Sequence, residues 1–205
     1  MSTVEARQRI PAAERRQQML AAASVVFGER GYAAATTDQI AAAAGVSQAY
    51  VVRVFGGKEN LFVEVARRAI DRITTAFRGA IAESNSTGSD DPKPVEARLG
   101  EAYIDLIADR GILLSLLQIF SLGHDPVIGP IGREGFLSIY RVVRDEAGLA
   151  PADASRFMSE GMMINTVLAL QLQESPDPDA AEMVTEVCGG DLGRFRSLAG
   201  TYPTT

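Results

Sequence analysis

Apolar residues recur at three- and four-residue intervals along most of this chain, which is the period of an amphipathic helix. In the first such segment, 12–30, Leu20, Val26 and Phe27 fall on one apolar stripe. Gly31 follows and is expected to end the helix as a C-terminal cap. Runs that alternate between apolar and polar residues, as a half-buried strand would, are limited to a few short ambiguous stretches. The pattern therefore predicts an all-α protein with about nine helices.

Two short helices are predicted after the first one. Thr36 can cap the second helix through its hydroxyl, and Gln39, three residues on, completes a capping box. Gly45 ends that helix, and Ser47 is placed to cap a third helix that runs to about Phe55. A short helix, a glycine-containing turn and a second helix with a polar start have the spacing of a helix-turn-helix.

Glycine, proline, serine and aspartate divide the remainder of the chain. Gly56 and Gly57 precede a long amphipathic helix that begins at Lys58 and continues to about Ser84, and the segment 84–94 is rich in loop-forming residues. Further helices, separated by glycine or proline, are predicted over the ranges 94–109, 111–122, 126–147, 151–174 and 178–199.

Charge is unevenly distributed along the sequence. The net charge of −6 at first argues against nucleic acid, because neutralising phosphates requires Lys and Arg. Residues 1–60, however, hold seven basic against five acidic residues, whereas 61–205 hold thirteen against twenty-one. This asymmetry suits a small DNA-binding head on an acidic body.

Composition restricts the chemistry that the protein can perform. Apolar residues make up 46% of the chain, which is enough to bury a core. One cysteine, Cys188, and one histidine, His124, cannot by themselves form a zinc site, and neither a nucleophile–base pair nor a phosphate-binding glycine loop is evident. We therefore expect no metal, no cofactor and no enzyme activity. The start of the chain lacks a secretory pattern and the apolar run 112–120 is too short to span a bilayer, so we expect a cytoplasmic protein with no membrane partner.

The third predicted helix carries the chemistry of base recognition. A helix that enters the major groove presents its first turns to base edges, so short or polar side chains there allow close approach and hydrogen bonding. We expect the face of this helix that points away from the DNA to pack inward through Val46, Val51, Val54 and Phe55. The exposed face is predicted to carry Ser47, Gln48, Ala49, Tyr50 and Arg53.

About fifty residues, from about Arg15 to Phe62, resemble the TetR family of transcriptional regulators. The resemblance rests on residue types at fixed offsets, namely Gly45, Val46-Ser47, Val54-Phe55 and Lys58-Glu59-Asn60-Leu61-Phe62, with Phe27, Gly31, Tyr32, Thr36 and Ile40 upstream. It implies three parts: a flexible tail at 1–11, a helix-turn-helix DNA-binding domain at 12–62 whose linking helix starts at 58, and an effector-binding and dimerisation domain at 63–205.

The resemblance also assigns roles within the DNA-binding domain. It implies that phosphates are held by Thr36 and Thr37, by Ser47 and Tyr50, and by Lys58, since helix N-termini attract anions. Gln48 and Arg53 are the candidates for reading bases. Family members commonly carry tyrosines where this chain has Val52 and Val54, and Tyr50 is the candidate to replace the missing phosphate contact. The alternative for Thr36, Ser47 and Lys58 is that they are helix caps and surface charge.

The C-terminal part is expected to dimerise and to bind a small apolar effector. The helices 151–174 and 178–199 are our choice for a homodimer interface built as a four-helix bundle, although Gly189, Gly190 and Gly193 leave the continuity of the last helix open. A mostly apolar pocket with a few polar groups is predicted, and solid core is the alternative for the same residues. Its expected lining is Tyr103, Ile107, Phe120, Phe136, Tyr140, Met158, Met162 and Asn165.

The sequence thus predicts a repressor that leaves operator DNA when an effector binds. Two alternatives stay open. The protein is an effector-independent DNA-binding regulator, or it is a helical enzyme or carrier for an apolar molecule in which the N-terminal motif serves only for packing. The identity of the effector, the operator sequence and the sign of regulation are not encoded in these patterns.

Overall fold

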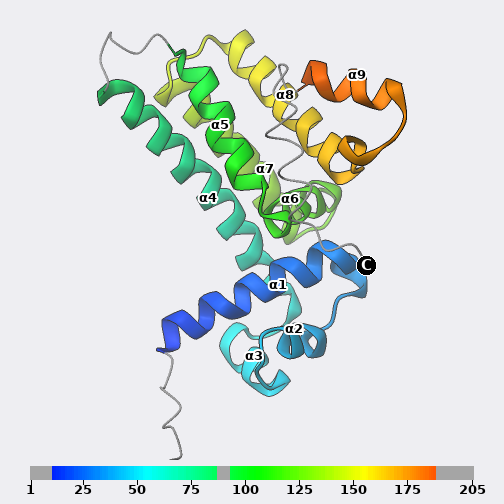
Figure 1. Ribbon diagram of the computed structural model, residues 1–205. Helices are drawn as coiled ribbons and strands as arrows, with labels where there is room; N and C mark the ends of the chain where they lie inside the picture. Colours follow the sequence, from blue (N-terminus) through cyan, green and yellow to red (C-terminus); the bar gives the residue numbers. More distant parts are fainter. Residues whose placement is uncertain (1–10, 87–92, 188–205) are drawn as a thin grey trace, which may run out of the picture.

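The computed structural model describes residues 11–86 and 93–187, and in these ranges it contains nine α-helices and no β-strand (Figure 1). The all-α prediction is therefore confirmed. Most of the predicted tail, 1–10, lies outside the described residues. The same holds for the predicted last helix beyond Val187, including its three glycines.

The first three helices form the lower end of the molecule in Figure 1. Helix α1 (Ala12–Ala34) is interrupted at Gly31, whose φ of 75° is left-handed, so the helical path breaks where the glycine predicts it. Helices α2 (Thr37–Ala43) and α3 (Gln48–Phe55) follow. The long helix α4 (Lys58–Ser86) then leads away from this end toward the remaining helices.

Two clusters of buried side chains hold the fold together. The N-terminal cluster combines residues of α1, α2, α3 and the first two turns of α4 with two residues from farther along the chain. Its members larger than alanine are Met19, Leu20, Val26, Phe27, Ile40, Val51, Phe55, Leu61, Phe62, Val65, Ile119 and Ile128. The C-terminal cluster is built on the rest of α4, whose Ile73 and Phe77 are almost fully buried.

The remaining helices lie along one side of α4 (Figure 1). They are α5 (Val95–Ile107), α6 (Arg110–Ser121), α7 (Ile128–Arg141) with a π-helical extension (Val142–Glu146), α8 (Pro151–Ala169), a 3-10 turn (Leu172–Glu174) and α9 (Pro178–Val187). Each start lies within about three residues of its predicted position. Among the described residues, no helix is both long and apolar enough to cross a membrane.

Helix α8 differs from its prediction, because it ends at Ala169 instead of continuing to residue 174. Gln171 takes a left-handed conformation with φ of 55°, which is unusual for a residue with a side chain. No glycine or proline marks this point in the sequence. The reversal lets α9 pack back on α8 and bury Val184, so tertiary packing overrides the local helical preference.

Helix α6 joins the two clusters by packing closely against α1. Gly28 allows the approach, since a Cβ there would lie only 2.7 Å from the Leu114 Cβ. The backbone N–H of Tyr32 donates a hydrogen bond to Gln118 Oε1 over 3.3 Å. Ile119, one residue farther along α6, is buried in the N-terminal cluster. The position of α6 is therefore coupled directly to the helix that supports α2 and α3.

Candidate nucleic-acid interface and effector cavity

Local hydrogen bonds fix the start of each short helix as the sequence predicts. Thr36 Oγ1 accepts a hydrogen bond from Gln39 N over 3.2 Å, and Gln39 Oε1 accepts one from Thr36 N over 3.1 Å, which completes the capping box. At α3, Ser47 Oγ accepts from Tyr50 N over 3.3 Å. Gly56 ends α3 in the left-handed region with φ of 81°. The turn between α2 and α3 is thus set by residues adjacent to it in sequence.

Helix α3 has one face in the core and one face in solvent. Val51 and Phe55 are buried in the N-terminal cluster, where the half-buried Val46 and Val54 also pack. All four residues expected to pack inward therefore do so. The opposite face exposes Ser47, Gln48 and Arg53 together with Ala49 and the apolar Val52.

Tyr50 and Arg53 interact on this exposed face. The Arg53 guanidinium carbon lies 4.8 Å from the centre of the Tyr50 ring, a separation at which a cation is attracted to the ring face. The ring of Tyr50 is half-buried against the N-terminal cluster. Tyr50 therefore forms a fixed support for the side chain that we predict to read bases.

Gln48 links the starts of α2 and α3. Its Nε2 donates a hydrogen bond to Thr37 Oγ1 over 3.2 Å. In this contact, as in the Ser47 cap, the hydroxyl oxygen is the acceptor, so each O–H remains free to donate to a phosphate oxygen. Capping and phosphate binding are thus compatible at these positions.

Lys58 has a structural role in addition to its position at the start of α4. Its Nζ donates to the carbonyl oxygens of Tyr32 at 3.0 Å and Ala33 at 3.2 Å and lies 4.8 Å from the centre of the Tyr32 ring. The ammonium has three N–H donors, and these two contacts leave one available. Lys58 ties α4 to the end of α1, and its predicted phosphate contact would use the remaining donor.

Six of the eight residues predicted to line an effector pocket surround one cavity among α4, α5, α6, α7 and α8. Ile107 does not line it, because its side chain is fully buried in the C-terminal cluster. Tyr140 lies instead in a surface groove between α7 and α8. The six that meet are Tyr103, Phe120, Phe136, Met158, Met162 and Asn165.

Half of the cavity lining was missed by the sequence reasoning. Ile73 and Phe77 come from α4, and their four-residue spacing was visible as part of an apolar stripe. Spacing alone does not say which apolar face meets a cavity, since that depends on the crossing of five helices. The other lining residues are Leu116, Ile139, Phe157 and Gly161.

One buried polar pair interrupts the apolar wall. The Tyr103 hydroxyl donates a hydrogen bond to Asn165 Oδ1 over 2.8 Å, and Asn165 is only 1% exposed. Burial raises the pKa of Tyr103 to about 12, so the hydroxyl keeps its proton at neutral pH. Among residues 11–86 and 93–187, Asn165 Nδ2 has only the Met162 sulfur as a hydrogen-bond partner, 3.8 Å away, and a thioether sulfur is a weak acceptor.

The cavity is small in this structure. Its volume is about 40 Å³, whereas sites for drug-sized molecules measure roughly 300–1,000 Å³. Met158 and Met162 lie in the wall, and methionine side chains adjust readily to a new shape. A small organic molecule would thus have to enlarge the cavity.

No three His, Cys, Asp or Glu side chains in residues 11–86 and 93–187 gather as potential metal ligands.

Comparison with known proteins identifies the N-terminal segment. Residues 19–65 match the model of the family described as bacterial regulatory proteins, tetR family. The HTH-type transcriptional activator FasR of Mycolicibacterium smegmatis is 39% identical over 99 residues, which cover 48% of this chain and 43% of that relative. The alignment thus spans less than half the length of FasR. Such relatives are named as transcriptional regulators and not as enzymes.

Solved structures extend the likeness to the whole fold. The fatty acid degradation regulator FadR from Bacillus halodurans superposes with a TM-score of 0.60 at 19% identity, over 86% of this chain and 97% of that one. The regulator LfrR from Mycobacterium smegmatis, solved in complex with proflavine, gives a TM-score of 0.57 at 23% identity, over 88% and 98% of the two chains. At these identities the likeness concerns the arrangement of helices.

Proposed function

We propose that this chain, whose residues 19–65 match the model of the tetR family of bacterial regulatory proteins, is a homodimeric repressor released from operator DNA by a small apolar effector. The observation that carries the proposal is the division of α3 into a buried face with Val51 and Phe55 and an exposed face with Gln48 and Arg53. A regulator of this kind acts where the chromosome lies, and we therefore infer a cytoplasmic location.

In this proposal some residues position the protein on the DNA backbone, and others read the base sequence. Thr36, Thr37 and Ser47 lie at helix N-termini and offer hydroxyl and backbone donors to phosphates, together with the remaining N–H of Lys58. Arg53, supported by Tyr50, and Gln48 are placed to meet base edges. Ala49 adds no polar group and allows the helix to approach the groove closely.

Dimerisation through α8 and α9 is supported by exposed apolar side chains on both helices. Leu170, which follows α8, is 64% exposed, and Met163 of α8 and Met183 of α9 are each 40% exposed. A second copy of the chain would cover these residues. A symmetric dimer places its two recognition helices in successive major grooves, with half-sites about 34 Å apart or a multiple of that distance.

Effector release follows from the position of Phe120. This residue lines the cavity, packs against both buried clusters and stacks edge-on with Phe136 at 5.6 Å between ring centres. A ligand that enlarges the cavity has to displace part of its wall, and displacement of α6 is passed to α1 through Gln118 and Gly28. Coupling requires that the ligand prefer the rearranged state, so ligand and DNA weaken each other's binding.

The small cavity also favours a second candidate, a DNA-binding regulator that needs no effector. A cavity of only about 40 Å³ is what such a protein would have. The sign of regulation is separate from this question, since FasR is named as an activator. Transcription of the neighbouring genes, measured with and without the protein, distinguishes repression from activation.

The DNA proposal is tested by the affinity for the DNA upstream of the protein's own gene, measured by fluorescence anisotropy over a salt series. We expect Arg53→Ala to weaken specific binding by about ten- to hundredfold, the cost of one bidentate base contact. Arg30→Ala, which removes an exposed arginine of α1, is the matched control and is expected to retain binding. Wild-type protein that does not bind, or binding insensitive to Arg53→Ala, would refute the proposal.

The dimer proposal is tested by sedimentation of the full chain. The double substitution Met163→Glu and Leu170→Glu introduces charge into the face that we assign to the partner, and it should yield monomers. Val25→Glu is the control, because Val25 is a comparably exposed apolar residue on α1, at 46%. If the double variant remains dimeric while folded, the interface lies elsewhere.

A further inference from the structure

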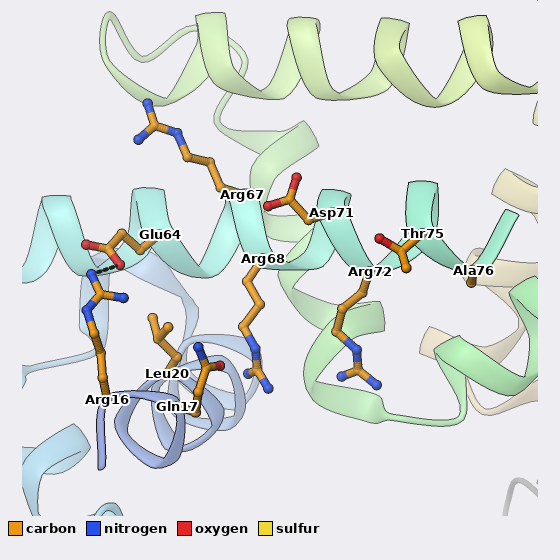
Figure 2. A pocket seen from close by; sticks show the side chains of 10 residues that line it. All are labelled: Arg16, Gln17, Leu20, Glu64, Arg67, Arg68, Asp71, Arg72, Thr75 and Ala76. Atoms are coloured by element: carbon orange, nitrogen blue, oxygen red, sulfur yellow. Dashed lines mark hydrogen bonds and ion pairs between the residues drawn. The ribbon is translucent and has the colours of Figure 1, made fainter. Parts of the chain in front are cut away.

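A second candidate site lies outside the effector cavity, in a groove between α1 and α4. The groove has a volume of about 720 Å³ and is open to solvent along one side. Helix α1 contributes Arg16, Gln17 and Leu20, and α4 contributes residues from Glu64 to Ala76 (Figure 2). Four arginines border it, one from α1 and three from α4, and of these Arg67 points away from α1 (Figure 2). Sequence reasoning did not single out this cluster.

The arginines differ in what they contact. Arg16 pairs with Glu64 and lies over the Phe55 ring, with 4.8 Å between the guanidinium carbon and the ring centre. Arg72 pairs with Asp109 at 2.9 Å. Arg68 has no hydrogen bond or ion pair with any residue in 11–86 and 93–187, although it is half-buried between the helices.

Arg68 lies beside a second cation and has no carboxylate partner of its own in the described residues. Burial lowers the pKa of Arg68, and the neighbouring cation of Arg72 lowers it further, while Asp109 acts in the opposite direction. The Asp109 carboxylate is already shared, because its other oxygen accepts from Gly111 N at the start of α6 over 3.0 Å. Of the other two carboxylates that line the groove, Glu64 pairs with Arg16 and Asp71 points to the opposite side of α4 (Figure 2). Arg68 is therefore left without a carboxylate partner of its own.

Figure 2 shows that Arg68 and Arg72 point from α4 to the same side, Arg68 toward α1 and Arg72 toward the start of α6, where it meets Asp109. They are four residues apart, so their side chains leave consecutive turns of one helix face. Gln17 of α1 borders the same space, and its exposed amide offers a further donor. Arg67 points to the opposite side of α4 (Figure 2).

We propose that this groove binds the phosphoryl group of a soluble metabolite, held by the guanidiniums of Arg68 and Arg72 with Gln17 at its edge. Two guanidiniums and an amide offer more donors than the two oxygens of a carboxylate accept, whereas a phosphoryl group presents three oxygens. The ligand would replace the missing counter-charge of Arg68. It would also connect α1 to α4 beside the start of α6.

The binding test uses inorganic phosphate as the probe and the full-length protein, with isothermal titration at constant ionic strength. We expect saturable binding to the wild type, and a dissociation constant at least about tenfold higher for Arg68→Gln, the loss of one charge-assisted contact. Arg67→Gln removes the same charge from the adjacent position and should bind like the wild type. Acetate and chloride should bind less tightly than phosphate.

Two outcomes overturn the proposal at this stage. Either phosphate binds no better than chloride at equal ionic strength, or Arg67→Gln weakens binding as much as Arg68→Gln does. Thermal unfolding checks that both variants fold. Phosphate also stabilises folded proteins without binding to a site, because it is excluded from their surface. Stabilisation by phosphate in thermal unfolding is therefore compared between Arg68→Gln and Arg67→Gln, and only the difference between the two variants reports on the site.

Operator affinity then distinguishes a metabolite from the DNA backbone as the source of the phosphoryl group. We expect Arg68→Gln and Arg67→Gln to bind DNA equally, within about twofold. A selective loss with Arg68→Gln, comparable to that of Arg53→Ala, would mean that the groove holds a DNA phosphate and would overturn the metabolite assignment. Phosphate binding does not require that the protein be a repressor, so the two proposals fail independently.

Discussion

The hydroxyl of Tyr103 on α5 donates a hydrogen bond of 2.8 Å to the side-chain oxygen of Asn165 on α8, and both groups are buried. The two residues lie 62 positions apart and connect opposite walls of the cavity. A buried donor and acceptor that satisfy each other stabilise one arrangement of α5 and α8. Any ligand that separates these helices has to satisfy both groups or leave them unpaired.

Removing one partner of this pair should cost more than removing both. We expect Asn165→Leu to lower the free energy of unfolding by about 1–3 kcal/mol, because the Tyr103 hydroxyl then lacks an acceptor. The double variant with Tyr103→Phe should lose less than Asn165→Leu alone, because no buried group is then left unpaired, and the coupling energy of the cycle should be about 0.5–3 kcal/mol. Urea denaturation of all four proteins at one concentration measures this cycle, and additive effects would contradict it.

Stability should fall at alkaline pH because of Tyr103. Its pKa is raised by burial from 10.0 to about 12, so the unfolded chain releases this proton more readily than the folded one. The stabilisation is present below pH 10 and is lost as pH rises through 12. We expect Tyr103→Phe to flatten the stability curve between these values. Parallel curves for wild type and variant would show that Tyr103 does not titrate in this way.

Gly135 should not tolerate a methyl group. A Cβ at this position would lie 2.1 Å from Ile70 Cδ1, where α7 crosses α4. Gly135→Ala is expected to destabilise the protein by about 1–3 kcal/mol, and Ile70→Val in the same chain should restore part of this loss. Gly79→Ala on α4 meets no neighbour within 4 Å and should instead stabilise the helix by about 0.5–1 kcal/mol. Thermal melting of these variants gives the comparison.

Tyr50 should contribute to DNA binding in two separable ways. Tyr50→Phe keeps the ring beneath Arg53 and loses only the hydroxyl, so we expect a uniform weakening across DNA sequences, typical of a lost phosphate contact. Tyr50→Leu also removes the ring and should relax base preference at the position that Arg53 reads. Affinities for a panel of single-base operator variants distinguish these effects. Identical profiles for both substitutions would argue against support of Arg53 by the ring.

The helix-turn-helix was predictable because its determinants are local. The Thr36 capping box and the Ser47 cap each involve residues three positions apart, and Gly56 takes the left-handed conformation that favours glycine. The inward and outward faces of α3 follow from the helical period of its own residues. The end of α8 was missed because Gln171 turns the chain with no local marker, in response to packing by α9.

The order and starts of the helices, the motif in the first sixty residues and the chemistry available on α3 are properties of short stretches of chain, and the amino-acid order alone determined them. The end of α8, the meeting of Tyr103 with Asn165, the small volume of the cavity and the gathering of Arg68 with Gln17 were decided by tertiary packing. The reason is physical: helical periodicity selects which face is apolar, whereas the angle and depth at which two helices pack depend on side chains that are distant in sequence.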